Sequence, residues 1–388
     1  MTVKEPEHIT MIRDSVRRVL NDCAPLEKVA QWDRDDFISR DMLKPVSDLG
    51  LCAVAVPEEY GGLGVDVRAV LVVIEELSRR SPMLAGLYIA NAIYGSFNIS
   101  ASGTEQQKRF FLPKLAAGEV LFSYGLSEPN VGADLASVQT RAERRGDRVI
   151  VNGAKRWCSG ADHNDYIYCL VRSGPAEARR NNLSLVLVPT RAEGITITST
   201  RTMGMRGIAT CDVTFDDVDL PFEESVVGGE AGWNHAWALL AGPALEAEKI
   251  QVPAMAVGMA EAAVDEAWEY AQQRKQFGAR ICAHQSVRHL LVDARTKLMA
   301  CRLMLDHCVE MVASGQPSAI DTSMAKLFIS ETAREIILEC QRVLGAYGYA
   351  EGFQMERLVR DVLVLPIWGG SSAIQKNNLA ALMRLPRD

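Results

Sequence analysis

One carboxylic acid stands inside an apolar helical pattern. Leu245, Glu248, Val252, Met255 and Met259 follow one another at alternating intervals of three and four residues. This spacing places side chains on one face of an α-helix. A carboxylate on such a face loses hydration, so burial should raise its pKa toward neutrality and make it a candidate base. The alternative is a structural carboxylate that a buried arginine or a helix end satisfies.

Two segments rich in small residues are candidate binding surfaces. Segment 124–134 reads Tyr-Gly-Leu-Ser-Glu-Pro-Asn-Val-Gly-Ala-Asp, and its glycine and proline residues favour a loop with exposed backbone N–H groups. Such a loop can hold an anion or a heteroaromatic edge, although read alone it is more commonly a surface turn. Segment 155–160 places Trp157 beside Cys158 and Ser159. This arrangement suits a flat cofactor or, alternatively, a core tryptophan at a strand end.

Several common site types are absent from the sequence. It contains no GxGxxG, GxxxxGK[ST] or GxSxG motif, so no Rossmann, P-loop or hydrolase site is indicated. The six histidines include no HExxH, and the nine scattered cysteines include no CxxC pair. We therefore expect no metal site and reduced thiols.

The composition is that of a globular protein with two or three domains. Of 388 residues, 48% are apolar and 23% charged. The formal net charge of −7 disfavours binding to nucleic acid or to anionic membranes. The sequence contains no run of eighteen apolar residues, so it predicts no transmembrane helix. The N-terminal MTVKEPEHIT lacks the apolar core of a signal peptide. We therefore expect a cytoplasmic protein.

Hydrophobic periodicity divides the chain into three parts. Apolar residues recur at helical spacing before about residue 120 and again after residue 233. Between them, β-branched or alternating segments predict strands, and the one at 148–151 is expected to end in an Asn152-Gly153 turn. The other predicted strands are 166–171, 183–189, 195–198 and 212–215, and the predicted long helices are 236–273, 284–314 and 317–344. We therefore predict an α+β fold with a helical domain at 1–120, a β domain at 121–232 and a helical bundle at 233–388.

An ordered series of motifs resembles the acyl-CoA dehydrogenase family of flavoproteins, and the resemblance extends over nearly the whole chain. The matching segments are 57–64, 103–108, 112–119, 126–134, 203–207, 215–221 and 274–278 with Gln285. The resemblance implies an N-terminal helical domain, a middle β-barrel-like domain and a C-terminal four-helix bundle. It also implies assembly as a homotetramer or homodimer.

FAD is the cofactor that this resemblance implies, held between the middle domain and the bundle and partly by a neighbouring subunit. The implied contacts fall into three groups: around the flavin ring, toward the diphosphate and substrate, and at the nucleotide end. In the third group, Arg274, Phe277 and Gln285 would come from the neighbouring subunit. They are Tyr124, Leu126, Ser127, Trp157, Cys158 and Ser159 for the ring, Gly132 and Ala133 for the diphosphate and substrate, and Arg274, Phe277, Gln285, Arg342, Gly345 and Ser371 for the nucleotide end.

The position of the base distinguishes this chain from many relatives, which carry it in a Tyr-Glu-Gly-Thr stretch near the C-terminus. The matching residues 368–371 are Trp-Gly-Gly-Ser, so Gly369 replaces the glutamate. Isovaleryl-CoA and long-chain acyl-CoA dehydrogenases also lack that glutamate and carry one on a bundle helix instead. Aligning that helix places Glu248 at the relocated position, the same residue that the apolar pattern selects. The implied substrate contacts are Ala133, Glu246, Lys249, Gly369 and Gly370.

The implied activity is FAD-dependent α,β-dehydrogenation of an acyl-CoA or acyl-carrier-protein thioester to the trans-2-enoyl product, within fatty acid and lipid metabolism. Glu248 would remove the α-proton, the β-hydrogen would leave as hydride to the flavin, and the Gly369 backbone N–H would stabilise the thioester oxygen. An electron-transfer flavoprotein would accept the electrons. Two alternatives are a flavin-dependent monooxygenase or other non-dehydrogenase on the same fold, and a non-catalytic subunit of a hetero-oligomer, since Gly369 lacks the usual acid.

Overall fold

The computed structural model describes residues 5–240 and 244–386, with only the backbone of Ala244 and Leu245. Helices form the N-terminal part of the chain. A π-helical turn, η4 (Ala92–Phe97), interrupts the helical run before β1. The α-helices here are α1 (Glu7–Cys23), α2 (Leu26–Asp35), α3 (Lys44–Ser47), α4 (Val67–Arg80), α5 (Pro82–Asn91), α6 (Asn98–Ser102) and α7 (Glu105–Ala116). The short 3-10 turns of the chain are η1 (Arg40–Leu43), η2 (Ala53–Ala55), η3 (Glu58–Tyr60), η5 (Leu135–Ser137), η6 (Ala176–Asn181), η7 (Ile281–Ala283) and η8 (Gly345–Gly348).

Local sequence explains where key helices of this part begin. The side chain of Asp66 accepts hydrogen bonds from the backbone N–H groups of Arg68 and Ala69 and caps α4. Thr104 and Gln107 form a reciprocal capping box at the start of α7. The buried α4 thereby receives a fixed start and direction.

A seven-stranded sheet occupies the middle of the chain in the order β1-β4-β2-β3-β7-β6, with β5 paired to β4. Strands β1 and β4 run parallel with Tyr124 opposite Tyr168. One core lies between strands, and a second lies where helices of the N-terminal part and α10 pack on the sheet. The strands are β1 (Phe122–Gly125), β2 (Arg141–Arg145), β3 (Arg148–Ser159), β4 (Tyr166–Arg172), β5 (Leu183–Pro189), β6 (Ile195–Thr200) and β7 (Thr210–Pro221), followed by helices α8 (Phe222–Ser225), α9 (Gly229–Gly232) and α10 (Ala236–Leu240).

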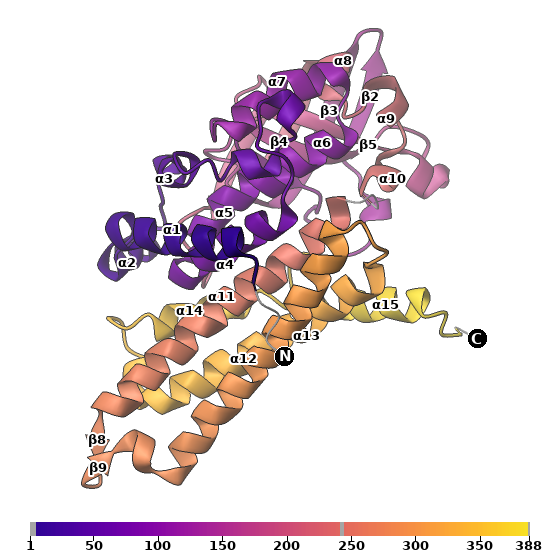
Figure 1. Ribbon diagram of the computed structural model, residues 1–388. Helices are drawn as coiled ribbons and strands as arrows, with labels where there is room; N and C mark the ends of the chain where they lie inside the picture. Colours follow the sequence, from indigo (N-terminus) through magenta and orange to yellow (C-terminus); the bar gives the residue numbers. More distant parts are fainter. Residues whose placement is uncertain (1–4, 241–243, 387–388) are drawn as a thin grey trace.

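Long antiparallel helices form the C-terminal part. Figure 1 shows α11, α12 and α13 lying side by side, with the β8–β9 hairpin at the end of the bundle far from the sheet. Apolar residues of α11, α12 and α13 join those of α4 and α5 in one continuous core. The elements are α11 (Ala244–Gln273), β8 (Lys275–Gln276), β9 (Ala279–Arg280), α12 (Gln285–Ala313), α13 (Ala319–Leu344), α14 (Met355–Val362) and α15 (Ser372–Leu382).

The alternation of helical, β and helical segments that the sequence predicts is present, but one predicted turn is wrong. Asn152 and Gly153 do not end a strand, because β3 continues to Ser159. A register shift between Val151 and Gly153 marks a β-bulge, and Gly153 has a φ of 138°, which glycine adopts readily. The proposed domain boundary near residue 120 falls between α7 and β1. The one near residue 232 falls between α9 and α10. Within the described ranges, none of the helices is long and apolar enough to cross a membrane.

Buried ion pairs clamp the N-terminal helices to the bundle. Glu75 on α4 pairs with Arg13 on α1 and with Arg302 on α12, whose Nη2 lies 2.9 Å from Oε1 of Glu75. Arg302 also pairs with Glu261 on α11. Burial alone would raise the pKa of Glu75, but Arg302 and Arg13 together hold it below its ordinary value. Four helices therefore meet at one charged cluster.

We predict that Glu75→Gln lowers the free energy of unfolding by about 3 kcal/mol, because it keeps the side-chain shape but leaves two buried guanidinium groups undercompensated. Chemical denaturation measures the change. The control is Glu310→Gln, which removes the half-exposed partner of Arg68 and should change stability by less than about 1 kcal/mol. Equal effects of the two substitutions would contradict the clamp.

Candidate active site

Glu248 lies in the first turns of α11, the helix that leads from the sheet into the bundle. Burial raises the pKa of its carboxyl to about 7, while a hydrogen bond from Tyr124 and the charge of Lys249 act in the opposite direction. Val252, Met255 and Met259 of the predicted stripe are buried, whereas the side chain of Leu245 lies outside the described residues. The structure therefore places a carboxyl group with a near-neutral pKa where the helical pattern predicts one.

Three tyrosines from separate elements form a column beside Glu248. The ring of Tyr124 on β1 stacks on Tyr94 of η4 with 3.9 Å between centroids, and on Tyr168 of β4 with 5.6 Å. The Tyr124 hydroxyl donates to Oε2 of Glu248 at 3.1 Å. Asn98, at the start of α6, donates to that same hydroxyl. The hydroxyl is therefore committed to Glu248 and Asn98, which leaves the Tyr124 backbone for the cofactor contact that the resemblance implies.

The stretch that carries the base in many relatives approaches α11 beside Glu248. Gly369 has a φ of 58°, and a Cβ added to it would lie 3.1 Å from Cγ2 of Val252, one turn beyond Glu248. Gly369 and Gly370 are exposed. Among the described residues, the Gly369 N–H has no hydrogen-bond acceptor. Gly369 therefore packs against α11 one helical turn from Glu248, and its N–H has no acceptor among the described residues.

The predicted substrate residues on α11 form a small polar network. Lys249 Nζ lies 2.9 Å from Oε1 of Glu246, and the Thr322 hydroxyl of α13 donates to the other Glu246 oxygen. Both side chains are largely shielded from solvent. This network holds the start of α11, which includes Glu248, against α13.

A buried ion pair shapes the predicted binding loop at 126–134. Lys155 on β3 is fully buried, and its Nζ donates to Oε1 of Glu128 at 2.9 Å and to the carbonyl of Leu126 at 3.1 Å. Glu128 also accepts from the backbone N–H groups of Gln139 and Thr140. Beyond this anchor the loop is open: Gly132 and Ala133 are exposed, and nothing lies within 4 Å of a Cβ added to Gly132. Leu126 and Ser127 are half-buried at its base.

In segment 157–159 the Trp157 side chain is exposed and the Cys158 thiol is buried. Trp157 has a φ of 67° and a side chain that is 55% exposed, an uncommon conformation for a bulky residue that clusters at functional sites. Ser159 is half-buried. Cys158 is fully buried in the core between strands, so only its backbone remains available for the cofactor contact predicted there.

The nucleotide-end residues lie far from Glu248 along the bundle. Arg274 and Phe277 flank the start of the β8–β9 hairpin, and Gln285 begins α12 (Figure 1). Twenty-six residues separate positions 248 and 274, which on a helix is about 40 Å. Phe277 is 95% exposed. One chain therefore does not bring these residues to its own Glu248.

The remaining predicted contacts lie at helix ends. Arg342 is exposed in the last turn of α13, and Gly345 caps that helix with a φ of 59°. The Ser371 hydroxyl accepts from the N–H of Ile374 and caps α15. Gly345 and Ser371 therefore have local roles as helix caps, whereas Arg342 is an exposed basic residue near a helix end.

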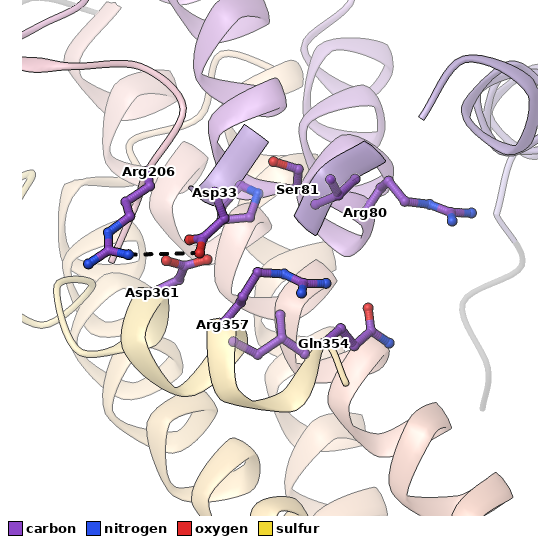
Figure 2. Close-up of a pocket in the computed structure, with 10 residues that line it drawn as sticks. Asp33, Arg80, Ser81, Arg206, Gln354, Arg357 and Asp361 are labelled. Atoms are coloured by element: carbon purple, nitrogen blue, oxygen red, sulfur yellow. Dashed lines mark ion pairs between the residues drawn. The ribbon is translucent and has the colours of Figure 1, made fainter. Parts of the chain in front are cut away.

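A separate small cavity lies where α2, α5 and α14 meet. Figure 2 shows Asp33, Arg206 and Asp361 on one side of it, with Arg357 pointing away from them. Its volume of about 20 Å³ corresponds to one or two water molecules. The lining residues, which include no predicted site residue, are Val29, Asp33, Arg80, Ser81, Pro82, Arg206, Gln354, Arg357, Leu358 and Asp361.

Sequence reasoning missed Asn98 and Tyr94. Both lie in the helical run 82–102, which the apolar residues dominate. The available signal was the presence of Asn91 and Asn98 in this largely apolar run, because buried amides require partners. Their link to Glu248 depends on a π-helical turn and on stacking across the sheet, neither of which has a sequence pattern of its own.

Comparison with known proteins identifies the class to which this fold and site belong. Three family models match in order: "Acyl-CoA dehydrogenase, N-terminal domain" over residues 6–119, the middle domain over 123–218 and the C-terminal domain over 237–383. The chain belongs to the acyl-CoA dehydrogenase family of oxidoreductases, whose members are FAD flavoproteins.

Individual relatives align over almost their full length. A 3-(aryl)acrylate reductase from Clostridium sporogenes is 32% identical, with 94% of this chain and 97% of the relative covered. An acyl-CoA dehydrogenase from Bacillus subtilis is 31% identical, with 94% of both covered. The structure of butyryl-CoA dehydrogenase from Megasphaera elsdenii superimposes with a TM-score of 0.92 at 26% identity, covering 99% of this chain and 100% of that one.

We predict that Lys155→Met loosens the loop at 126–134, because Glu128 then remains buried without its cation. Hydrogen exchange of the Gln139 and Thr140 amides, which Glu128 holds, should accelerate by roughly tenfold or more. Mass spectrometry of peptides covering 126–140 measures this. Lys44→Met, which removes an exposed lysine paired with Asp48, is the control and should leave these amides unchanged.

Proposed function

We propose that this enzyme catalyses FAD-dependent α,β-dehydrogenation of an acyl-CoA or acyl-carrier-protein thioester to the trans-2-enoyl product, with Glu248 as the base. The observation that carries the proposal is the position of Glu248, next to the segment where many relatives hold the acid and hydrogen-bonded to Tyr124. A pKa of about 7 suits proton abstraction at neutral pH.

The residues of this chain would perform the proton transfer and stabilise the charge that it creates. The free oxygen of the Glu248 carboxylate takes the proton from the carbon next to the thioester. Charge then develops on the thioester oxygen, and the exposed N–H of Gly369 is a donor without a competing partner among the described residues. Glu246 and Lys249 position the substrate at the start of α11, with Gly370 and Ala133 lining its path.

The residues that the resemblance assigns to FAD have the chemistry that it needs. The half-exposed Trp157 offers an aromatic plane, Leu126, Ser127 and Ser159 offer backbone and hydroxyl groups, and the open backbone around Gly132 admits a diphosphate. When bound, FAD supplies the hydride acceptor.

A second copy of the chain would complete the cofactor site. The distance of about 40 Å along α11 separates Arg274, Phe277 and Gln285 from the Glu248 of their own chain, and the exposure of Phe277 favours a contact between subunits. We propose a homodimer or homotetramer on this basis. An electron-transfer flavoprotein is the proposed electron acceptor.

The alternatives from the sequence are less well supported by the site. A flavin-dependent monooxygenase requires no base beside a thioester, and a non-catalytic subunit requires none at all. A partly buried carboxylate needs a hydrogen bond or a nearby charge, and the side chain that hydrogen-bonds Glu248 is a hydroxyl rather than a cation. This arrangement favours the dehydrogenase.

We predict that Glu248→Gln keeps FAD but slows reduction of the flavin by an acyl-CoA panel by about 10³-fold, because the amide cannot accept the proton. Anaerobic bleaching of the flavin absorbance measures this rate. Glu269→Gln on the same helix, whose exposed carboxylate accepts only from Gln273, is the control. Undiminished bleaching in the Glu248 variant would refute the assignment.

We also predict the pH dependence. Only the ionised carboxylate is a base, and burial raises the pKa of Glu248 to about 7. The kcat/KM for an acyl-CoA substrate should therefore rise with pH, fall about tenfold per unit below the pKa and level off above it. A profile that stays flat between about pH 5.5 and 8 would exclude a carboxyl group with this pKa as the base.

A further inference from the structure

We propose that the Tyr124 hydroxyl, anchored by Asn98, is a positioning group that orients the Glu248 carboxylate and keeps it in its ionised form. This inference rests on the proposed role of Glu248 as the base. It assigns to the Tyr124 side chain a function separate from any contact of the Tyr124 backbone with a flavin.

The direction of the hydrogen bonds follows from the donors and acceptors present. The amide nitrogen of Asn98 donates to the backbone carbonyl of Tyr94 at 3.2 Å. A carbonyl only accepts, so this contact fixes which end of the amide is the nitrogen. The same nitrogen donates to the Tyr124 hydroxyl. The single phenolic proton of Tyr124 is therefore left to point at Oε2 of Glu248, 3.1 Å away.

Stacking holds the Tyr124 ring in place from both faces. Tyr94 lies at 3.9 Å with an interplanar angle of 20°, and Tyr168 lies at 5.6 Å with an angle of 28°. A ring between two others and tied at its hydroxyl has little freedom. The hydrogen bond therefore fixes one oxygen of Glu248 and leaves Oε1 for the substrate.

The bond also opposes the main effect of burial on Glu248. The titratable groups around this carboxylate are Tyr124 on β1, Tyr94 on η4, Tyr168 on β4 and Lys249 beside it on α11. Burial raises the pKa of all three tyrosines, so their phenols stay protonated at neutral pH. Lys249 is already paired with Glu246, so Tyr124 is the group that directly hydrogen-bonds the charged form of Glu248.

The test compares the pH profiles of Tyr124→Phe and wild type. Losing a hydrogen bond to a charged group should raise the apparent pKa in kcat/KM by roughly one to two units. The rate should then fall about tenfold at pH 7 and recover near pH 9. Tyr168→Phe, which keeps the column but removes a hydroxyl without a hydrogen bond to Glu248, should leave the profile unchanged. A uniform loss of rate at every pH would overturn the proposal.

A second measurement does not depend on activity. Infrared titration of the holoenzyme, with the band that Glu248→Gln abolishes as the assignment, reports protonation of Glu248 directly. The same upward shift is expected in Tyr124→Phe, and a smaller one in Asn98→Ala, which serves if the first variant does not fold. An unshifted band in the variant that folds would reject the proposal.

The two hypotheses fail separately. If Glu248→Gln remains active, the assignment of the base is wrong. If Glu248→Gln is inactive while Tyr124→Phe titrates like wild type, the base stands and the positioning role of Tyr124 falls.

Discussion

A carboxyl group whose pKa is raised to about 7 by burial needs nearby donors to favour its ionised form, and Glu248 obtains one across the junction between sheet and bundle. Its helix belongs to the bundle, whereas the hydroxyl that bonds it belongs to β1. The proposed chemistry therefore depends on how accurately the sheet and the bundle meet. An error of 1 Å at this junction would break a bond of 3.1 Å, and the buried acid would then favour its neutral form.

Two sets of buried charges elsewhere in the molecule fix relative positions, one among the helices and the other between a loop and the sheet. The Glu75 cluster joins α1, α4, α11 and α12 through two arginines, and α4 packs along α11. Lys155 and Glu128 play the corresponding part in the sheet, because they fasten the loop after β1 to β3. Buried ion pairs contribute little net stability compared with apolar packing, but breaking one is costly. Such pairs specify a geometry. Here the Glu75 cluster includes α11, which carries Glu248, and the Lys155–Glu128 pair holds the loop that follows Tyr124 on β1.

The sequence was sufficient for the elements and for selecting Glu248 as a candidate, and insufficient for how that side chain is held. Helical spacing identifies Glu248 because the periodicity of α11 is a local property. The stacking of Tyr94 on Tyr124 is not local, since it joins a π-helical turn to a strand about thirty residues away. Asn152-Gly153 shows the same limit: the dipeptide is typical of a turn, but pairing of β3 with β7 makes it a bulge within a longer strand. Cys158 lies next to two exposed or half-exposed residues in sequence, yet it joins the core between strands, at a point where the register of β3 against β7 shifts.

The absence of an acid at position 369 follows from the same geometry. Gly369 has a positive φ, and a Cβ there would lie 3.1 Å from Val252, so a larger residue would need both a strained backbone and a shift of its neighbour. A carboxylate at position 369 would also be attached beside Val252, one helical turn from the residue that carries the Glu248 carboxylate. Two carboxylates that share a site cannot both ionise near neutral pH, and one would lose its value as a base. In the proposed mechanism α11 therefore supplies the acid, and Gly369 contributes a backbone N–H that has no acceptor among the described residues.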